Sequence, residues 1–298
     1  MCFFVQVCIV ALSVLVFPLS SNRGAAQLPR HELRQAMAPV PAQAPPQAHP
    51  APAIESARPR ALPVPPLPSP PQTVALSVLV VGDSLSISLG EQLEEFFTRQ
   101  HGVHFKRVGK VSSGLARPDF FDWEEQLTAL ANQTRPSLVV IMIGTNDNKP
   151  LSRHGGHAAA FGSAGWAREY TARAQRLLDI CQASNPDARV FWVGAPIMGQ
   201  SELRDDVVRI NSVISDLCTR NRNCLYVDTW RTLADENGQF TQYWTSEHGE
   251  RIKIRADDGV HLSFTGSRLL ALRCLDVMLH TPPLQTLARP VAFDGLGG

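Results

Sequence analysis

The first stretch suited to chemistry is Gly82-Asp83-Ser84, which directly follows the apolar run from Val78 to Val81. A serine at a strand-to-helix turn has an exposed hydroxyl and a free backbone N–H. Both features suit a nucleophile whose attack creates an oxyanion. Taken alone, the turn is better explained as a helix cap made by Asp83 or Ser84. The case for a nucleophile therefore depends on partners elsewhere in the chain.

Three further stretches carry glycine or polar residues at the ends of predicted strands or before a predicted helix. They are Gly114, the segment from Gly144 to Asp147 that includes Asn146, and the segment from Asp258 to His261. The carboxyl ends of parallel strands lie along one edge of a sheet, where open α/β sheets bind their ligands. We expect these stretches to converge with Ser84 at that edge.

The elements that must position these residues alternate along the chain. Apolar runs predict five strands, at 78–81, 104–111, 137–143, 189–194 and 225–228. Helical periodicity predicts five helices, at 86–99, 120–131, 164–184, 202–219 and 265–279. This alternation predicts an α/β fold, a flavodoxin-like three-layer α/β/α sandwich with a five-stranded parallel sheet in the order 2-1-3-4-5. Residues 240–255 are expected to form a hairpin over a turn at 247–249.

The composition divides the chain of 298 residues into three parts. Residues 1–26 are expected to be a signal peptide, since an apolar run precedes a small-residue cleavage site at 24–26, or an N-terminal anchor, since the basic start of a signal peptide is missing. Residues 27–73 contain 14 of the 23 prolines and are expected to be a disordered linker. Residues 74–298 form the predicted globular domain. We therefore expect export to the periplasm or beyond, with membrane contact only through residues 1–26.

Charge and cysteine usage limit the partners. The formal net charge of +1 gives no reason to expect nucleic acid. Outside the N-terminal segment the cysteines are Cys181, Cys218, Cys224 and Cys274. A Cys218–Cys224 bridge and buried free thiols are both open. A zinc site would need His154 with His157, or His101 with His104, but no cysteine or carboxylate pattern supports either pair. No metal and no cofactor are expected.

The four stretches together resemble the four sequence blocks of the SGNH/GDSL hydrolases. This resemblance implies that Ser84 is the nucleophile, His261 the general base and Asp258 the residue that orients the imidazole. Asp257 is an alternative orienting residue by sequence alone, but the family spacing favours Asp258. The resemblance also implies an oxyanion hole made of the backbone N–H groups of Ser84 and Gly114 and the side-chain amide of Asn146. We interpret Asp83 and Asp147 as structural.

The sequence of residues 112–123 resembles that of an uncharacterised, exported branch of the family. The expected function is a serine esterase acting on O-acyl esters, especially O-acetyl esters, of cell-envelope or secreted polysaccharide. An O-acyltransferase to a glycan acceptor with the same triad is the alternative, and a non-catalytic glycan-binding protein is a third. The expected partner is an acylated polysaccharide or a small ester. The loop 148–165 is expected to form a rim or lid. Tyr243 and Trp244 are candidates for stacking on sugar rings or for hydrophobic cover on the hairpin.

Overall fold

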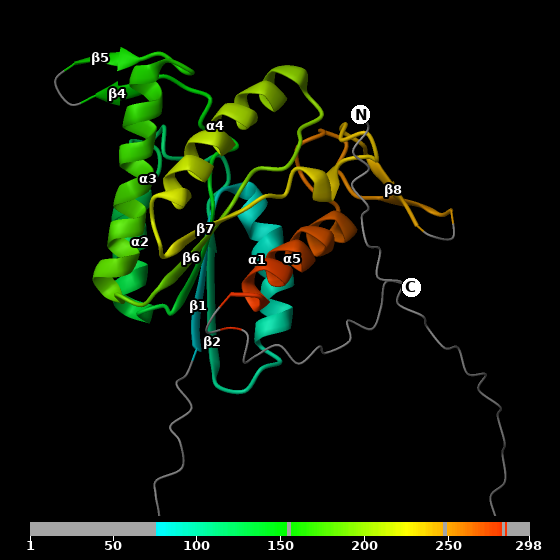
Figure 1. Ribbon diagram of the computed structural model, residues 1–298, viewed down its shortest axis with the longest axis horizontal. Helices are drawn as coiled ribbons and strands as arrows, with labels where there is room; N and C mark the ends of the chain where they lie inside the picture. The colour runs from blue at the N-terminus through cyan, green and yellow to red at the C-terminus, as the bar shows by residue number, and fades with distance from the viewer. Residues whose placement is uncertain (1–75, 154–155, 247–248, 282–283, 285–298) are drawn as a thin grey trace, which may run out of the picture. The chain divides into compact units, whose positions relative to one another are not determined.

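The computed structural model describes residues 76–153, 156–246, 249–281 and 284. Its centre is a parallel five-stranded sheet in the order β2-β1-β3-β6-β7 (Figure 1). The strands are β1 Leu76–Gly82, β2 Val103–Gly109, β3 Leu138–Met142, β6 Arg189–Val193 and β7 Cys224–Val227. Numbered along the core sheet alone, this is the predicted order 2-1-3-4-5, and the predicted α/β fold is confirmed.

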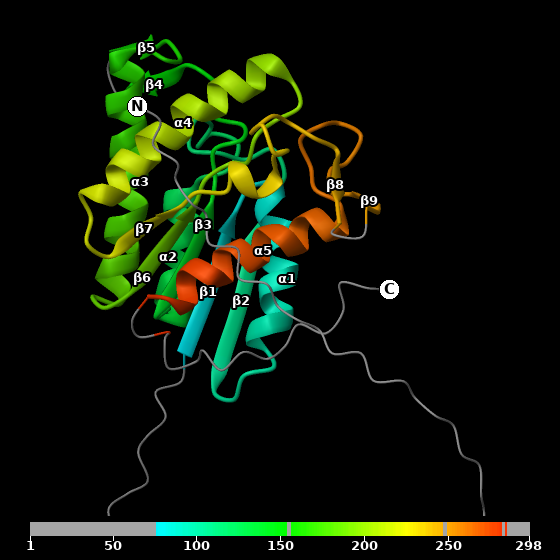
Figure 2. The same cartoon turned by 45° about the vertical axis from the view of Figure 1, so that its right-hand side comes forward.

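Helices cover both faces of the sheet (Figures 1 and 2). They are α1 Ser84–Phe97, α2 Trp123–Thr134, α3 Ala164–Ser184, α4 Ser201–Thr219 and α5 Phe264–Leu279, with the 3-10 helix η1 Arg231–Leu233. Alternate residues of β1 belong to two separate cores. Val78 and Val80 pack with α1 and α5, whereas Leu79 and Val81 pack with α2, α3 and most of α4. Burial on both faces explains why the strand is apolar without interruption.

Helix α2 begins later than predicted. The sequence predicted a helix over 120–131, but the structure places it at Trp123–Thr134. Asp122 ends the preceding loop and caps the helix, because its Oδ1 accepts the backbone N–H groups of Glu124 and Glu125 at 2.9 and 3.1 Å. Phe120 therefore lies in the loop, where it is 50% exposed. Its aromatic side chain was wrongly assigned to the apolar stripe of the helix.

Two small hairpins lie outside the central sheet. Strands β8 Tyr243–Thr245 and β9 Arg251–Lys253 pair in antiparallel fashion and confirm the hairpin predicted within 240–255 (Figure 2). Residues 247 and 248 of its predicted turn lie outside the described residues. The loop expected at 148–165 contains a second antiparallel pair, β4 Leu151–Arg153 and β5 Gly156–Ala159.

Of the four cysteines of the domain, two form the disulfide considered from the sequence and two are buried free thiols. Cys218 and Cys224 form a disulfide that joins the end of α4 to the start of β7. Cys181 and Cys274 are buried free thiols, and burial raises the pKa of each to about 12.

The two N-terminal segments predicted at 1–26 and 27–73 lie outside the described residues, and their assignments stay predictions. In the part of the chain that the structure describes, no helix is both long and apolar enough to cross a membrane.

Candidate active site

The turn after β1 brings Ser84 to the carboxyl edge of the sheet. Gly82 is required there, because a Cβ at this position would lie 2.0 Å from the Met142 carbonyl oxygen on neighbouring β3. The buried Asp83 then caps α1, with its Oδ1 accepting the Leu85 N–H at 3.0 Å. The capping role thus falls to Asp83, which leaves the hydroxyl of Ser84 available for chemistry.

Asp83 also ties this turn to the end of β3. Its Oδ2 accepts the backbone N–H groups of Gly144 and Thr145 at 3.2 and 3.1 Å. Burial raises the pKa of Asp83 to about 6, although these hydrogen bonds favour the charged form. The Asp147 carboxylate nearby adds to the rise. Two of the four predicted blocks are therefore joined through one buried carboxyl group.

Ser84, His261 and Asp258 form a continuous chain of hydrogen bonds. Ser84 Oγ lies 2.9 Å from His261 Nε2, and His261 Nδ1 lies 2.6 Å from Asp258 Oδ2. With the ring proton on Nδ1, the imidazole donates to the carboxylate and Nε2 accepts the serine hydroxyl. Two residues 177 positions apart are thus brought within hydrogen-bond distance. This is the arrangement of a nucleophile, a base and an orienting acid.

The segment from Asp258 to His261 is a compact turn. Asp258 Oδ1 accepts the backbone N–H groups of Val260 and His261 at 2.8 and 2.9 Å, while Oδ2 faces the ring. Partial burial acts to raise the pKa of Asp258, but the hydrogen bonds from the His261 ring and from the two backbone N–H groups outweigh it and lower the pKa to about 2. Asp258 is therefore a carboxylate at any pH near neutrality. Asp257 instead pairs with Lys253, which removes it as the alternative orienting residue.

The side chain of Arg255 holds this turn in place. The sequence analysis did not identify this residue. Its side chain is fully buried, and it donates to the carbonyl oxygens of Val260 at 3.2 Å and Ile197 at 2.5 Å. Burial lowers the pKa of Arg255 to about 10, which keeps the guanidinium charged at neutral pH. The loop that carries the histidine is thus fixed to the chain that follows β6.

A hydrogen bond joins Asn146 to the residue that precedes Gly114. Asn146 Nδ2 donates one of its hydrogens to the Ser113 carbonyl oxygen at 2.9 Å. That carbonyl shares a peptide unit with the Gly114 N–H, so the bond orients both groups. Within the described residues, neither the Ser84 N–H nor the Gly114 N–H donates a hydrogen bond. The three predicted oxyanion donors therefore keep hydrogens available for a substrate.

Asp147 holds the loop that carries Gly114. Its Oδ2 accepts the Leu115 N–H at 3.0 Å and its Oδ1 accepts the Ala116 N–H at 2.8 Å. Burial raises the pKa of Asp147 against these bonds. Ser112, two residues before Gly114, has a φ of 61°, which is uncommon for a residue other than glycine. The interpretation of Asp147 as structural agrees with these contacts.

The two predicted stacking residues lie on the separate hairpin. Tyr243 and Trp244 on β8 are each 37% exposed, and the Arg251 guanidinium lies 4.5 Å from the Tyr243 ring centroid. Among the described contacts, none joins either aromatic ring to Ser84 or His261. Their role toward sugar rings stays a prediction.

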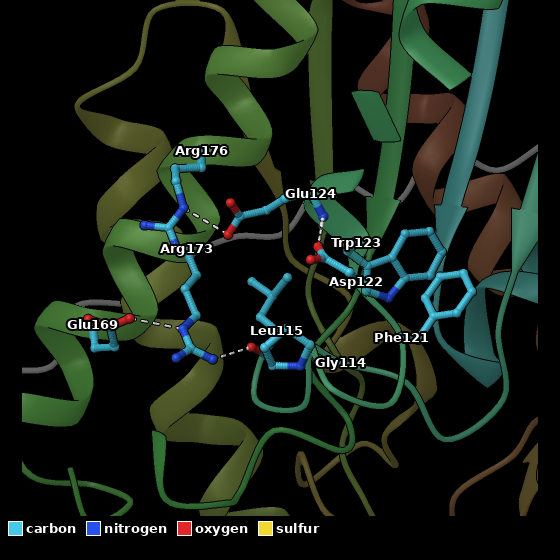
Figure 3. Close-up of a pocket in the computed structure, with 10 residues that line it drawn as sticks. Gly114, Leu115, Phe121, Asp122, Trp123, Glu124, Glu169, Arg173 and Arg176 are labelled. Carbon is cyan, nitrogen blue, oxygen red and sulfur yellow. Dashed lines mark hydrogen bonds and ion pairs between the residues drawn. The ribbon is translucent and has the colours of Figure 1, made fainter. Parts of the chain in front are cut away.

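A cavity of about 680 Å³ lies between α2, α3 and the Gly114 loop (Figure 3). Its lining includes Gly114 but neither Ser84 nor His261, so it lies behind the loop rather than at the nucleophile. Four of its charged residues form two ion pairs, Arg173 with Glu169 and Arg176 with Glu124. The fifth, Asp122, caps α2.

No group of three or more histidine, cysteine or acidic side chains that could hold a metal ion occurs among the residues the structure describes. Of the histidine pair considered for zinc in the 148–165 segment, His154 lies outside those residues.

The fold is a three-layer α/β/α arrangement, and its site holds a serine, a histidine and an aspartate joined by hydrogen bonds. Residues 77–277 match a family model described as "Protein of unknown function (DUF459)", and the chain belongs to this family. A comparison with curated proteins gave no match.

Several solved structures are similar at low identity. A member of the lipolytic protein G-D-S-L family from Veillonella parvula is 16% identical, with a TM-score of 0.48, over 70% of this chain and 100% of that one. A carbohydrate esterase family 3 structure from Talaromyces cellulolyticus is 15% identical, with a TM-score of 0.47, over 68% of this chain and 96% of that one.

Proposed function

We propose that this protein is a serine esterase that cleaves O-acyl esters through an acyl-serine intermediate. The observation that carries the proposal is the hydrogen-bond chain from Ser84 through His261 to Asp258, at 2.9 and 2.6 Å. A serine hydroxyl is a weak nucleophile unless a base removes its proton, and a neutral imidazole at this distance is such a base.

In the first half of the reaction, Ser84 Oγ attacks the ester carbonyl carbon while its proton passes to His261 Nε2. The Asp258 carboxylate stabilises the imidazolium that forms. The negative charge on the carbonyl oxygen is stabilised by the N–H groups of Ser84 and Gly114 and by the Asn146 amide. Collapse of the tetrahedral intermediate breaks the bond to the leaving alcohol, whose oxygen takes the proton from His261.

In the second half, water replaces the alcohol. His261 removes a proton from the water as it attacks the acyl carbon, and Ser84 leaves with that proton restored. Every step is a transfer of a proton or an acyl group, so this mechanism uses no cofactor and no metal.

The substrate we propose is an O-acyl ester, especially an O-acetyl ester, of a cell-envelope or secreted polysaccharide. Two features support a location outside the cytoplasm, the apolar N-terminal sequence and the Cys218–Cys224 disulfide, since disulfides persist in oxidising compartments. The exposed rings of Tyr243 and Trp244 offer stacking surfaces for sugars. A small soluble ester is the simplest substrate of the same class.

The proposal is tested by the hydrolysis of p-nitrophenyl acetate by the full-length chain and its Ser84→Ala and His261→Ala variants. Both substitutions should lower kcat at least about 1,000-fold. Folding is monitored by circular dichroism and should persist. Lys253→Ala removes the partner of Asp257 outside the triad and should leave kcat within about twofold, as is usual for a surface ion pair. Turnover by Ser84→Ala equal to that of the wild type would contradict the serine mechanism.

A further inference from the structure

Helix α3 places two polar side chains in a face that is otherwise apolar and buried. Tyr170 is 0% exposed and Arg173 is 7% exposed, and the remaining buried residues of the helix are Trp166, Ala174, Leu177, Leu178 and Cys181. A buried arginine requires partners for its charge and its donors. The partners of Tyr170 and Arg173 lead directly to the loop that carries Gly114.

Arg173 contacts two other segments and one residue of its own helix. Its Nη1 donates to the Leu115 carbonyl oxygen at 2.8 Å, and its Nη2 donates to the Ser152 carbonyl oxygen at 2.6 Å. Its Nε pairs with Glu169, one turn earlier on the same helix, at 3.0 Å. Figure 3 shows the guanidinium lying between Glu169 and Leu115 at the edge of the cavity. Arg173 thus fixes the Gly114 loop to a rigid helix at one carbonyl group.

Tyr170 acts on the same loop through Asp147. Its hydroxyl donates to Asp147 Oδ2 at 2.7 Å, and this oxygen also accepts the Leu115 N–H. The Tyr170 ring stacks on Trp166 with centroids 4.6 Å apart and planes at 10°. A hydroxyl on a ring held in this way sets the position of the carboxylate.

Three consecutive peptide units of the Gly114 loop are each held by at least one side chain. The peptide that contains the Gly114 N–H is held at its carbonyl end by Asn146, at 2.9 Å. The next peptide is held by Asp147 at the Leu115 N–H. The peptide between Leu115 and Ala116 is held at both ends, by Arg173 at its carbonyl and by Asp147 at its N–H. Once these neighbours are fixed, little freedom remains for the Gly114 N–H.

We propose that Tyr170 and Arg173 are positioning residues that hold the Gly114 N–H where a developing oxyanion needs it. This inference rests on the proposed esterase function and deepens it. Electrostatic stabilisation of an oxyanion depends on donors that are in place before the reaction, because no reorganisation is then needed at the transition state. Neither residue touches the substrate, so both act through the loop.

The test compares Tyr170→Phe and Arg173→Lys with the matched control Arg176→Lys in the full-length chain. Arg176 lies on the same helix but makes an exposed ion pair with Glu124 rather than a contact with the loop. Lysine at position 173 keeps the positive charge but carries its donors on one nitrogen, so it cannot reproduce the three separate contacts of the guanidinium. Phenylalanine at position 170 removes only the hydroxyl. The steady-state kinetics of p-nitrophenyl acetate hydrolysis and the inhibition constant of methylboronic acid are measured for each variant.

We expect kcat to fall about 10- to 100-fold in both test variants, less than the loss of a whole oxyanion donor. KM should stay within about threefold, because the substrate carbonyl carries little charge before attack. The inhibition constant should rise in parallel with the loss of kcat, since the boronate adduct of Ser84 presents a tetrahedral oxygen to the same donors. Arg176→Lys should match the wild type in all three quantities.

Two results would overturn the inference while leaving the proposed function intact. One is activity of folded Tyr170→Phe and Arg173→Lys equal to that of Arg176→Lys, with Ser84→Ala inactive. The other is a loss of activity that follows only the fraction of unfolded protein, with an unchanged inhibition constant. Failure of the esterase proposal gives a different result, which is turnover that persists in Ser84→Ala. Tyr170→Phe keeps the shape of the ring and provides the readout if Arg173→Lys does not fold.

Discussion

Replacement of Gly114 by alanine tests the oxyanion loop at its tightest point. A Cβ at this position would lie 2.0 Å from Asp147 Oδ1, whereas ordinary contacts of such an atom begin at 3.4 Å. The loop or the carboxylate must therefore move by about 1.4 Å, the difference between these two distances. Asp147 is fully buried and its carboxylate is held by the Tyr170 hydroxyl, so the movement falls on the loop itself.

The expected effect on catalysis follows from this displacement. A donor that moves by more than 1 Å from a hydrogen-bond distance of about 2.9 Å no longer makes a useful bond. Loss of one oxyanion donor lowers kcat by about 100- to 1,000-fold. Crowding in a buried loop should also lower the free energy of unfolding by about 1 to 3 kcal/mol. The assays are p-nitrophenyl acetate kinetics and urea unfolding of the full-length chain.

Gly165→Ala is the matched control. Its Cβ would meet its nearest neighbours, on Ala159 and Ser163, at the ordinary distance of 3.7 Å. Since Gly165 lies within α3, alanine should leave kcat unchanged and raise the free energy of unfolding by up to about 1 kcal/mol. A folded Gly114→Ala protein with wild-type kcat would refute the assignment of the Gly114 N–H as an oxyanion donor.

Three further predictions concern the triad, a buried carboxyl group and the disulfide. Asp258→Asn should lower kcat about 1,000- to 10,000-fold, because an amide cannot stabilise the imidazolium of His261. Stopped-flow or steady-state assays measure this loss, and a loss below tenfold would contradict the orienting role. Burial raises the pKa of Asp83 from 3.8 to about 6, so the folded protein binds more protons than the unfolded chain between these values. The contribution of Asp83 to the free energy of unfolding should therefore fall by up to about 3 kcal/mol as the pH rises from about 4 to above 6. Burial raises the pKa of Asp147 as well, so some slope should remain in Asp83→Asn. Urea unfolding across this range should give a shallower slope in Asp83→Asn than in the wild type, and equal slopes would contradict the contribution of Asp83. Replacing both Cys218 and Cys224 by serine should lower the free energy of unfolding by about 2 kcal/mol, as the loop-closure relation gives for the small ring that they close. Urea unfolding measures this change, and an unchanged midpoint would show that the bridge does not form.

The arrangement of the triad could be predicted because two independent rules agree on it. The apolar strands and their alternation with helices fix which residues lie at the carboxyl edge of the sheet. The four blocks then identify Ser84, Asp258 and His261 among the many polar residues there. The structure brings these three within hydrogen-bond distance, and it separates Asp257 from the ring by pairing it with Lys253.

Local boundaries were harder to predict, because short-range polar contacts decide them. Phe120 has the spacing of an apolar residue one turn before α2, but Asp122 caps the helix and leaves the Phe120 ring in the loop. The glycine-rich segment after Asn146 lacks the apolar alternation of a strand, but β4 and β5 form there. Periodicity misleads at Phe120 and gives no signal in the glycine-rich segment.

Arg173, Tyr170 and Arg255 were missed because their partners are remote in sequence. Arg173 meets Leu115 across 58 residues, and Arg255 meets Ile197 across 58 residues. One signal was present, since Arg173 and Tyr170 interrupt an otherwise apolar face of a helix that was itself predicted correctly at 164–184. A polar residue in such a stripe indicates a buried partner, although the sequence does not say which one.

The central claim is that Ser84 becomes acylated with the help of His261. Its most direct test is active-site labelling of the full-length chain with a fluorophosphonate, followed by peptide mass spectrometry. We expect one phosphonylated residue, Ser84, with no label in Ser84→Ala and labelling slowed at least about 100-fold in His261→Ala. Label on a different residue, or ester turnover that persists after Ser84 is fully labelled, would contradict it.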